Sequence, residues 1–337
     1  MKRSVFSVVD PHPGEPTRNA ERQKEVVRLA EAADSAGLSA LWVAEHHFGD
    51  TGLCPSPAVL LAACGARTRR IRLGPLVSVL PFHDPVELAE EYALLDRLLD
   101  GRLNFGVGSG YVATELDGFG IDLTSKRERF DRALATIRSA WAGEEVRVDR
   151  PGSHPVRLNV RPLQLPHPPI TVAVQRREAI RHVAEHGFSI ALIPYATVKD
   201  RAELAEEIAE FRRAAPAGST AQVAVAMHTY IGADVRRARE ALQRYLDSRL
   251  ASASTFYQHK VADDPHAAHA SAIESSGLAL FGSAEEFRRE AAALEAIGVD
   301  ELLAIVEFGD LPFRLTVESV RALGAAASEA SDPHGSM

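Results

Sequence analysis

Short apolar runs alternate with longer amphipathic stretches along the first half of the chain. Residues 4–9 and 38–44 are apolar runs short enough to be buried strands. Between them, apolar side chains from residue 21 to residue 36 recur at helical spacing, and Gly37 follows as a helix cap. This alternation is typical of βαβ units, in which helices connect the neighbouring strands of a parallel sheet.

The alternation continues along the chain and predicts eight strands. Two helix starts are marked clearly, by Ser56 before Pro57 and by Asp84 before Pro85, because Ser or Asp followed by proline is a preferred helix beginning. We predict an α/β fold, a (β/α)8 TIM barrel with inserted segments. The predicted strands are residues 4–9, 38–44, 71–80, 103–107, 170–174, 188–193, 223–231 and 301–306, and the later helices lie near residues 125–141, 177–186, 199–214, 234–252 and 283–297.

Two segments depart from the alternation. Residues 143–165 are polar and contain several prolines, which indicates an inserted hairpin, and residues 253–280 lack periodicity, which indicates a mobile loop. The length of 337 residues is within the range of one elaborated barrel. We therefore expect residues 1–327 to form a single barrel domain and residues 328–337 to be a disordered tail.

The composition narrows the classes of partner. A net charge of -8 argues against a nucleic-acid-binding surface, which needs a basic face to neutralise phosphates. The chain has no stretch of about 18 apolar residues, and its start lacks the apolar core of a secretory signal. Cys54 and Cys64 are the only cysteines, so we expect no disulfide framework. We expect a cytoplasmic protein that acts on small molecules, without nucleic-acid or membrane partners.

Residues able to do chemistry gather where predicted strands end. The run Glu45-His46-His47-Phe48 follows the second strand, the glycine-rich run 106–110 ends the fourth, and Gln175-Arg176 follows the fifth. Barrel enzymes place their active sites at the C-terminal ends of the strands. We therefore expect these three segments to share one site.

The Glu45-His46-His47 run has three interpretations. Histidine and carboxylate are common metal ligands, but neighbouring strand residues point to opposite faces, so three in a row cannot easily converge on one ion. The run could also simply end the strand. We favour an active-site histidine, His46, because imidazole changes its protonation near neutral pH and can transfer protons or hydrogen-bond to an oxygen intermediate.

The glycine run and two arginines indicate a flat or anionic ligand. The glycines at 106, 108 and 110 do not match the dinucleotide fingerprint and follow the fourth strand rather than the first, so we expect no Rossmann domain. They allow the backbone to approach a ligand closely, or they form a simple turn. Arg127 and Arg176 lie near predicted helix starts, where backbone N–H groups favour phosphate, and Gly282-Ser283 is a weaker candidate of the same kind.

Several segments together resemble the bacterial luciferase-like family of flavin-dependent monooxygenases. They are LWVAEHHF (41–48), RIRLGPLVSVLPFHDPVELAEEYALLDRLLDGRLNFGVGSG (70–110), GFGID (118–122), FGSAEEF (281–287) and IGVDELLAIVEFG (297–309). Within that family, the segments MHTYIGA (227–233), YLDSRL (245–250) and VEFGDLP (306–312) are similar to enzymes of natural-product biosynthesis.

The resemblance implies roles for individual residues. His46 matches the catalytic histidine, which assists the formation and use of the flavin hydroperoxide. Leu76 and Val77 match a pair, often joined by a cis peptide, against which the isoalloxazine packs. Gln175 and Arg176 stand where the luciferase pattern has a carboxylate and a serine. The cofactor-binding positions implied are Glu45, Leu76, Val77, Gly108, Ser109, Gly110, Arg127, Gln175 and Arg176.

The resemblance also implies a reaction and its partners. We expect a homodimeric monooxygenase that takes reduced FMN from a separate flavin reductase as a co-substrate and uses O2 to oxygenate a small organic molecule, in natural-product biosynthesis. The alternatives are a deazaflavin-dependent oxidoreductase of the same fold, a non-catalytic FMN-binding protein and a metal-dependent barrel hydrolase. Phe82, Phe119, Tyr111 and Tyr230 could shape an apolar substrate pocket or serve only in packing.

Overall fold

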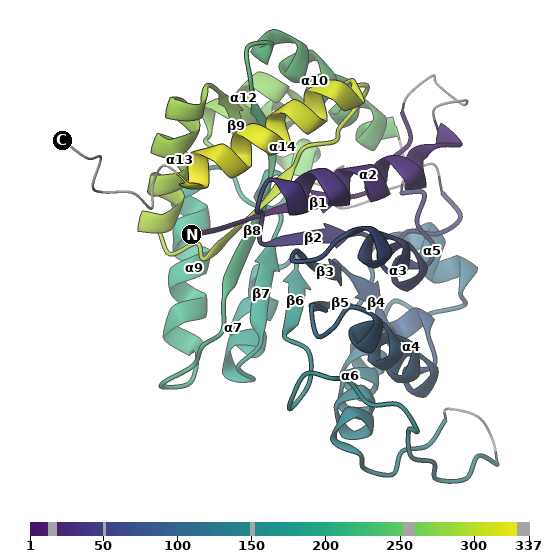
Figure 1. The fold of residues 1–337 in the computed structure, drawn as a ribbon. Coiled ribbons are helices and arrows are strands. Elements are labelled where there is room, and N and C mark those ends of the chain that lie inside the picture. Colours follow the sequence, from purple (N-terminus) through teal and green to yellow (C-terminus); the bar gives the residue numbers. More distant parts are fainter. Residues whose placement is uncertain (13–18, 50–51, 149–151, 252–259, 329–337) are drawn as a thin grey trace.

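The computed structural model describes residues 1–12, 19–49, 52–148, 152–251 and 260–328. Its strands form one sheet in which all neighbours are parallel (Figure 1). The strands are β1 (Lys2–Ser7), β2 (Ala40–Val43), β3 (Arg72–Pro75), β4 (Ser78–Val79), β5 (Phe105–Gly108), β6 (Ile170–Val174), β7 (Ser189–Leu192), β8 (Val223–Ile231), β9 (Ala279–Gly282) and β10 (Glu301–Ile305).

The sheet curls until its two ends meet. The strand order is β3-β2-β1-β10-β8-β7-β6-β5-β4, and a parallel bridge between Leu73 of β3 and Leu103, just before β5, joins the ends. β3 and β4 are successive pieces of one barrel strand, separated by Leu76 and Val77, while β9 pairs only with the second half of β8. The remaining strands give the eight positions of a (β/α)8 barrel, so the predicted fold class is confirmed.

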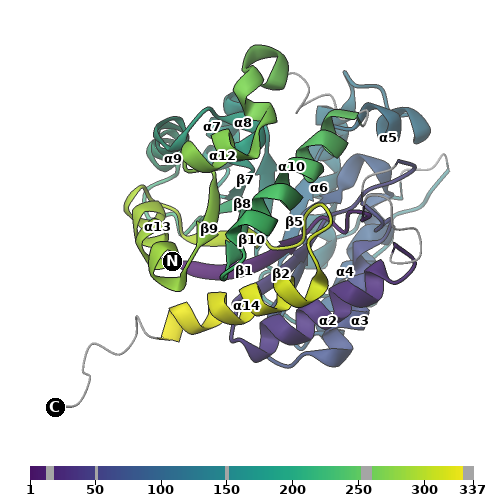
Figure 2. The ribbon, with the colours of Figure 1, turned by 90° about the horizontal axis from the view of Figure 1, so that it is seen from above.

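Helices cover the outside of the barrel, as Figure 2 shows in a view turned by 90° from that of Figure 1. The last helix packs against α2, so the two ends of the described chain meet on one side of the barrel. The helices are α2 (Arg22–Ser35), α3 (Pro57–Arg67), α4 (Pro85–Leu98), α5 (Ala113–Gly118), α6 (Lys126–Ala142), α7 (Arg177–Glu185), α8 (Pro194–Thr197), α9 (Arg201–Ala214), α10 (Val235–Ala251), α12 (Ala270–Ser275), α13 (Ala284–Ala296) and α14 (Phe313–Ser328), with the short 3-10 helices η1 (Leu80–Phe82) and η2 (Pro265–Ala268).

Two of these helices begin at the residues that the sequence predicted. α3 begins at Pro57 and α4 at Pro85, and the Asp84 carboxylate accepts hydrogen bonds from two backbone N–H groups of the first turn of α4. Every residue of β2, β5, β8 and β10 is buried, because helices cover one face of a barrel strand and the core covers the other.

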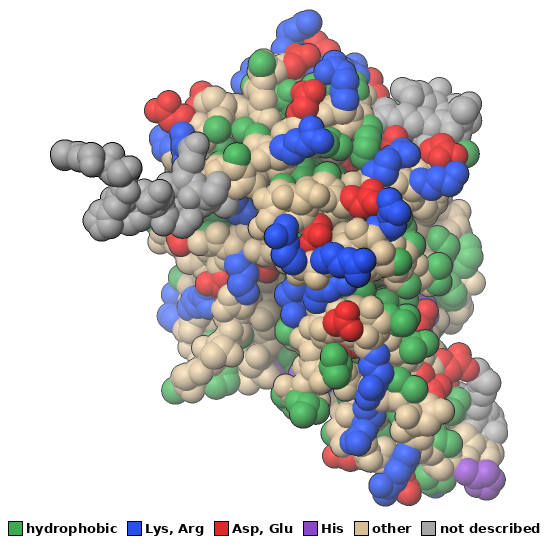
Figure 3. All heavy atoms as spheres, in the orientation of Figure 1, with side chains coloured by type: hydrophobic (Ala, Val, Ile, Leu, Met, Phe, Trp, Pro, Cys, Tyr) green, Lys and Arg blue, Asp and Glu red, His purple; other side chains and the backbone are tan. Residues whose placement is uncertain are grey.

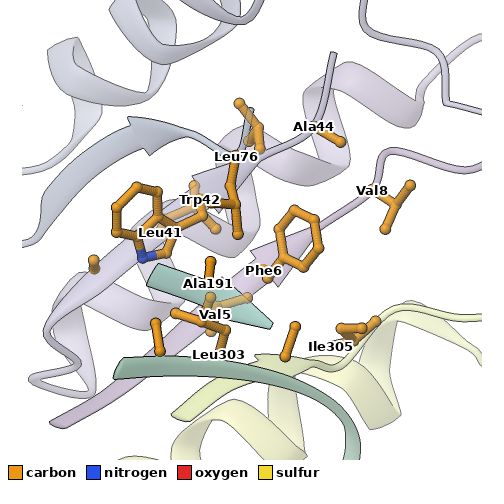
Figure 4. Packing of buried hydrophobic residues seen from close by; sticks show 14 of the residues in the cluster. Val5, Phe6, Val8, Leu41, Trp42, Ala44, Leu76, Ala191, Leu303 and Ile305 are labelled. Atoms are coloured by element: carbon orange, nitrogen blue, oxygen red, sulfur yellow. The ribbon is translucent and has the colours of Figure 1, made fainter. Parts of the chain in front are cut away.

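Apolar side chains from several strands meet inside the barrel (Figure 4). In that view Phe6 of β1, Leu76 after β3 and Ile305 of β10 are buried, and the same three residues line the cavity described below. These core residues therefore also contribute to the lining of the candidate site.

Several predicted strands differ from the observed ones by one or two residues at an end, and the first and third differ more. β1 spans Lys2–Ser7 rather than residues 4–9, and the third barrel strand, predicted as residues 71–80, is divided into β3 and β4. A mainly apolar run gives no sign of the break between β3 and β4, because the residues before, within and after the break are all hydrophobic.

The inserted segments also differ from expectation. Residues 143–165 form a single antiparallel bridge, between Val146 and Val156, rather than a regular hairpin, and 149–151 lie outside the described residues. The segment 253–280 was predicted as a mobile loop, and this is wrong for its described part. Residues 260–263 are helical, and η2, α12 and β9 follow. Elements of four to six residues are too short to show a helical or strand period.

The remaining expectations concern the tail, membrane spans and surface. The predicted disordered tail, 328–337, lies outside the described residues apart from Ser328, which ends α14. Among the described residues, no helix is long and apolar enough to cross a membrane. Basic and acidic side chains are interspersed on the face shown in Figure 3, so that face carries no extended field of one sign.

Candidate functional site

One cavity of about 870 Å³ opens at the C-terminal ends of the barrel strands. Its size is typical of a site for a cofactor and a small substrate. All ten site residues predicted from the sequence line it, and they come from the ends of four strands and the start of α6. They are Glu45, His46, Leu76, Val77, Gly108, Ser109, Gly110, Arg127, Gln175 and Arg176.

His46 is held in one orientation by a carboxylate from another element. Its Nδ1 donates to Oε1 of Glu115 on α5 at 2.8 Å, and both side chains are almost fully buried. The same oxygen accepts the backbone N–H of His47 at 2.9 Å. Because a carboxylate can only accept, the hydrogen of the neutral ring sits on Nδ1, which leaves Nε2 as the atom that can accept or deliver a proton.

Gly52 holds the other side of the His46 ring. It has a φ of +66°, and a Cβ placed on it would lie 2.4 Å from Cδ2 of His46. Its backbone N–H donates to Asp10 at 3.0 Å. A glycine is therefore required both for the backbone conformation and for the space that the imidazole occupies.

Glu45 connects the second barrel strand to the third. Its carboxylate accepts hydrogen bonds from Nε2 of His47 at 3.0 Å, from Nε2 of His83 at 2.8 Å and from the backbone N–H of Val79 at 3.1 Å. Burial alone would raise the pKa of Glu45, but the hydrogen bonds from the two histidines lower it overall. Burial likewise opposes the charge on His83, yet Glu45 raises its pKa. Both shifts favour the ionised form of the pair, and its hydrogen bond ties the end of the second strand to the third.

One part of the cavity lining, here called the floor, is the backbone around Leu76 and Val77. The peptide between Leu76 and Val77 is cis, as the resemblance implied, and β5 passes close beside it. A Cβ on Gly108 would lie 2.7 Å from Cγ2 of Val77, and Gly110 has a φ of +75°. Glycines at these two positions bring the β5 turn against Val77 and leave an apolar surface on which a planar ring can lie.

Positive charge gathers at one end of the cavity. Lys126 and Arg127 begin α6, and Arg176 precedes the first residue of α7. Lys126 is half-buried, its Nζ donates to the carbonyl oxygen of Gly110 at 2.7 Å, and burial together with Arg176 lowers its pKa. Arg127 is half-exposed and paired with Asp131 at 2.9 Å. Cations beside the N-terminus of a nine-residue helix are suited to an anionic group.

Phenol groups and one ion pair form the opposite end. Tyr195 of α8 and Tyr245 of α10 are buried, with their hydroxyl oxygens 3.1 Å apart. Arg249 of α10 lies over the ring of Tyr245 and donates to the carboxylate of Asp10 at 2.6 Å. Tyr111 completes this end next to the edge of the His46 ring.

Sequence reasoning missed Lys126, Glu115, Tyr195, Tyr245 and Arg249. Lys126 could have been found, because it adjoins Arg127 at a predicted helix start. Tyr245 and Arg249 lie in the segment 245–250 that contributed to the resemblance, but that segment gave them no role, and Glu115 and Tyr195 carried no local signal.

Other candidates lie outside the cavity lining. Of the four aromatic residues considered for a substrate pocket, only Tyr111 lines it. Phe82 and Phe119 stack on each other, and Tyr230 is buried in the barrel wall. Ser283 forms a capping box with Glu286 at the start of α13, so the hydroxyl already binds its own helix. Within the described residues, no group of three or more His, Cys, Asp or Glu is placed to hold a metal ion.

These features fit a flavin mononucleotide by shape and by charge. The lining combines the apolar side chains of Leu76 and Val77, a group of cations and a buried histidine, and a Cβ on Gly108 would meet Val77. The floor would hold the ring system, and Lys126 and Arg176 with the start of α7 would hold the phosphate.

Comparisons with known proteins show which family the chain resembles. A family model described as luciferase-like monooxygenase matches residues 1–330. "Uncharacterized protein y4wF" of Sinorhizobium fredii is 32% identical over 317 residues, which cover 91% of this chain and 92% of that protein. The oxygenase component of flavin-dependent trigonelline monooxygenase of Acinetobacter baylyi is 30% identical over 173 residues, 50% of this chain and 48% of that one. The crystal structure of monooxygenase RslO1 from Streptomyces bottropensis aligns with a TM-score of 0.82 at 26% identity, covering 98% and 99% of the two chains.

Proposed function

Since the chain belongs to the luciferase-like monooxygenase family, we propose that it uses reduced FMN from a separate reductase, together with O2, to oxygenate a small organic substrate. The observation that carries this proposal is that one cavity is lined by the cations Lys126 and Arg176, by the Leu76–Val77 cis peptide and by His46. When bound, reduced FMN would supply two of the four electrons that reduce O2, and the substrate would supply the other two, so that one oxygen atom enters the substrate and the other leaves as water.

The residues of the chain bind the flavin, orient its ring and transfer a proton in the cavity. Lys126 and Arg176 neutralise the phosphate, while Leu76, Val77 and Gly108 position the ring and exclude water from one face. Glu115 holds His46 so that Nε2 is available to donate or accept a proton in the cavity. Glu45 takes part indirectly, because its carboxylate is engaged with His47, His83 and the backbone of the third strand.

A separate reductase is supported by the absence of a dinucleotide fingerprint from the sequence, whose glycines at 106, 108 and 110 lack the required spacing. The Acinetobacter relative is itself named as an oxygenase component. A role in natural-product biosynthesis remains a prediction from the resemblance.

We also propose a homodimer. Val59 of α3 and Leu94 and Leu98 of α4 are 68%, 51% and 62% exposed, and the two helices pack side by side. These exposed apolar side chains are offered as the contact for a second copy of the chain. Light scattering on the purified protein tests this proposal, and a monomer at micromolar concentration would contradict it.

Cofactor binding can be tested without knowing the substrate. Replacing Lys126 with Met should weaken FMN binding roughly 10- to 150-fold, the loss of about 1.5–3 kcal/mol from one charge-assisted contact, and should leave riboflavin binding nearly unchanged because riboflavin lacks the phosphate. Lys24→Met is the matched control, since Lys24 is 70% exposed and binds Glu21 on the surface. Equal losses for FMN and riboflavin would contradict the phosphate assignment.

Turnover is tested by co-expression with a flavin reductase under ¹⁸O2, with mass spectrometry of candidate metabolites. Incorporation of one labelled oxygen atom is expected, and His46→Ala should abolish it while FMN binding changes less than about threefold. A protein that binds oxidised FMN tightly and yields no labelled product would instead be a flavin-binding protein. Tighter binding of a deazaflavin than of FMN would contradict the choice of cofactor.

A further inference from the structure

Asp10, which follows β1, binds two parts of the molecule with one carboxylate. Its Oδ1 accepts the backbone N–H of Gly52 at 3.0 Å, and its Oδ2 accepts from Nη2 of Arg249 at 2.6 Å. Arg249 lines the cavity, and Gly52 lies against His46. The side chain of Asp10 is only 13% exposed, so solvent screens these contacts weakly. Asp10 therefore connects two different sides of the candidate site.

The contact with Gly52 fastens residues 52–54 to the chain that follows the first strand. The next residue, Leu53, donates its backbone N–H to the carbonyl oxygen of Val9 at 2.8 Å. This neutral hydrogen bond and the charge-assisted one to the Asp10 carboxylate hold the segment at two neighbouring points. The charge-assisted bond is the stronger, because an ionised acceptor roughly doubles the strength of a hydrogen bond. The segment therefore depends on Asp10 for the stronger of these two attachments.

Residues 52–54 in turn support the imidazole of His46. The backbone N–H of His46 donates to the carbonyl oxygen of Cys54 at 3.1 Å. Gly52 lies so close to the ring that a Cβ on it would lie 2.4 Å from Cδ2 of the imidazole. Because Glu115 binds Nδ1, the ring is fixed by a hydrogen bond at one edge and by van der Waals contact at another. A shift of the segment would give the ring room to move.

Asp10 is itself held by a buried network of charges. Its backbone carbonyl oxygen accepts from Nε of Arg22 on α2 at 2.8 Å. Nη1 of Arg22 donates to the carboxylates of Glu25 at 3.2 Å and of Glu307, after β10, at 2.6 Å. All three of these charged residues are buried. The network therefore fixes the backbone from which the carboxylate of Asp10 reaches the site.

We propose that Asp10 is a positioning residue, whose carboxylate holds residues 52–54 against the imidazole of His46 and so keeps the ring in its working orientation. This inference rests on the proposed function, in which His46 transfers a proton. Asp10 is not among the residues that line the cavity, so it acts through the segment and not by touching the flavin or the substrate. The alternative is a purely structural role, in which Asp10 only neutralises Arg249, and the experiments below separate the two.

The first test is a double-mutant cycle, measured as the rate at which the protein, loaded anaerobically with reduced FMN, reacts with O2. Asp10→Ala should slow the His46-dependent step roughly tenfold, because a displacement of about 1 Å at a catalytic group already has a large effect on rate. In a His46→Ala background the same substitution should slow the reaction less than about twofold further, since no imidazole is left to position. Asp263→Ala, at an exposed carboxylate, is the matched control and should react like the wild type. Equal slowing in both backgrounds would overturn the inference.

A second pair of variants allows for the loss of stability expected when Arg249 is buried without this carboxylate. Arg249→Met removes the guanidinium and keeps the hydrogen bond between Asp10 and Gly52. Adding Asp10→Ala to it removes that hydrogen bond together with the second charge of the pair, and this step should again slow the reaction roughly tenfold. Slowing of less than about twofold would show that Asp10 serves Arg249 alone.

Hydrogen exchange gives a readout that does not depend on turnover. The Nδ1–H of His46, which is hydrogen-bonded to Glu115, can be followed by NMR in the flavin-free protein. Asp10→Ala should speed its exchange with solvent at least roughly tenfold, because the ring is released locally. The indole N–H of Trp42, which donates to Glu301 in the core, should exchange as in the wild type. Unchanged exchange at His46, or equal acceleration at both sites, would contradict the positioning role.

The two readouts separate this inference from the proposed function. If His46→Ala leaves the reaction with O2 unchanged while Asp10→Ala speeds exchange at His46, the positioning holds and the proposed role of the histidine fails. If His46→Ala slows the reaction while Asp10→Ala changes neither the rate nor the exchange, the proposed function stands and the positioning role is refuted.

Discussion

Glu115 offers a sharp test of how His46 is positioned. One oxygen of its carboxylate, Oε1, accepts both the Nδ1–H of His46 and the backbone N–H of His47. Glu115→Ala removes both hydrogen bonds and leaves two donors buried without that acceptor. Glu115→Gln has a side chain of the same shape whose carbonyl oxygen can accept both hydrogen bonds, so it removes only the charge.

The size of the effect follows from these contacts. A hydrogen bond to a charged group contributes about 1.5–3 kcal/mol, and each 1.4 kcal/mol corresponds to roughly a factor of ten in rate. If the contact with Glu115 holds His46 in its working orientation, Glu115→Ala should slow the His46-dependent step roughly 10- to 150-fold. Glu115→Gln should slow it about tenfold, the difference between a charged and a neutral acceptor.

The assay is stopped-flow mixing of the protein loaded anaerobically with reduced FMN against aerated buffer, with flavin absorbance as the signal. His46→Ala defines the rate without the imidazole, and Glu285→Ala, an exposed residue on α13, is the matched control. FMN affinity should change less than about threefold in either Glu115 variant, because Glu115 contacts the histidines and not the cationic end. Wild-type kinetics in a folded Glu115→Ala protein would refute the positioning role.

Three further predictions concern the site and its supports. Gly52→Ala should displace His46 and slow turnover at least roughly tenfold, with a loss of about 1 kcal/mol or more of stability from the left-handed backbone, and an unchanged rate would contradict the contact. The pKa of His83 is raised and the pKa of Glu45 is lowered, so the pair stabilises the fold fully between the ordinary pKa of Glu45 and the ordinary pKa of His83. This stabilisation should be lost as the pH rises through the raised pKa of His83. Thermal melting against pH should show this decline in the wild type and not in His83→Asn. Two arginines lower the pKa of Asp310 from 3.8 to about 2, so Asp310→Asn should cost about 2 kcal/mol of unfolding free energy at neutral pH and little at pH 2, as chemical denaturation would measure.

Some of the site could be read from the sequence because its residues sit at strand ends. Glu45, His46, Gly108 and Arg176 each follow or end an apolar run, and the carboxyl ends of parallel strands meet on one side of a barrel. The aromatic residues were harder to place. Tyr230 also lies at a strand end, yet it packs into the barrel wall, because successive side chains of a strand point to opposite faces.

The kind of fold and the reactive strand ends could be predicted without coordinates, because hydrophobic periodicity and turn residues are local properties of the chain. Which side chains meet at those ends depends on the folded barrel. Glu115 reaches His46 across 69 positions of chain, and Arg249 reaches Asp10 across 239. Such pairs depend on how the barrel closes and on which way each helix turns its side chains, and both follow from packing over the whole molecule.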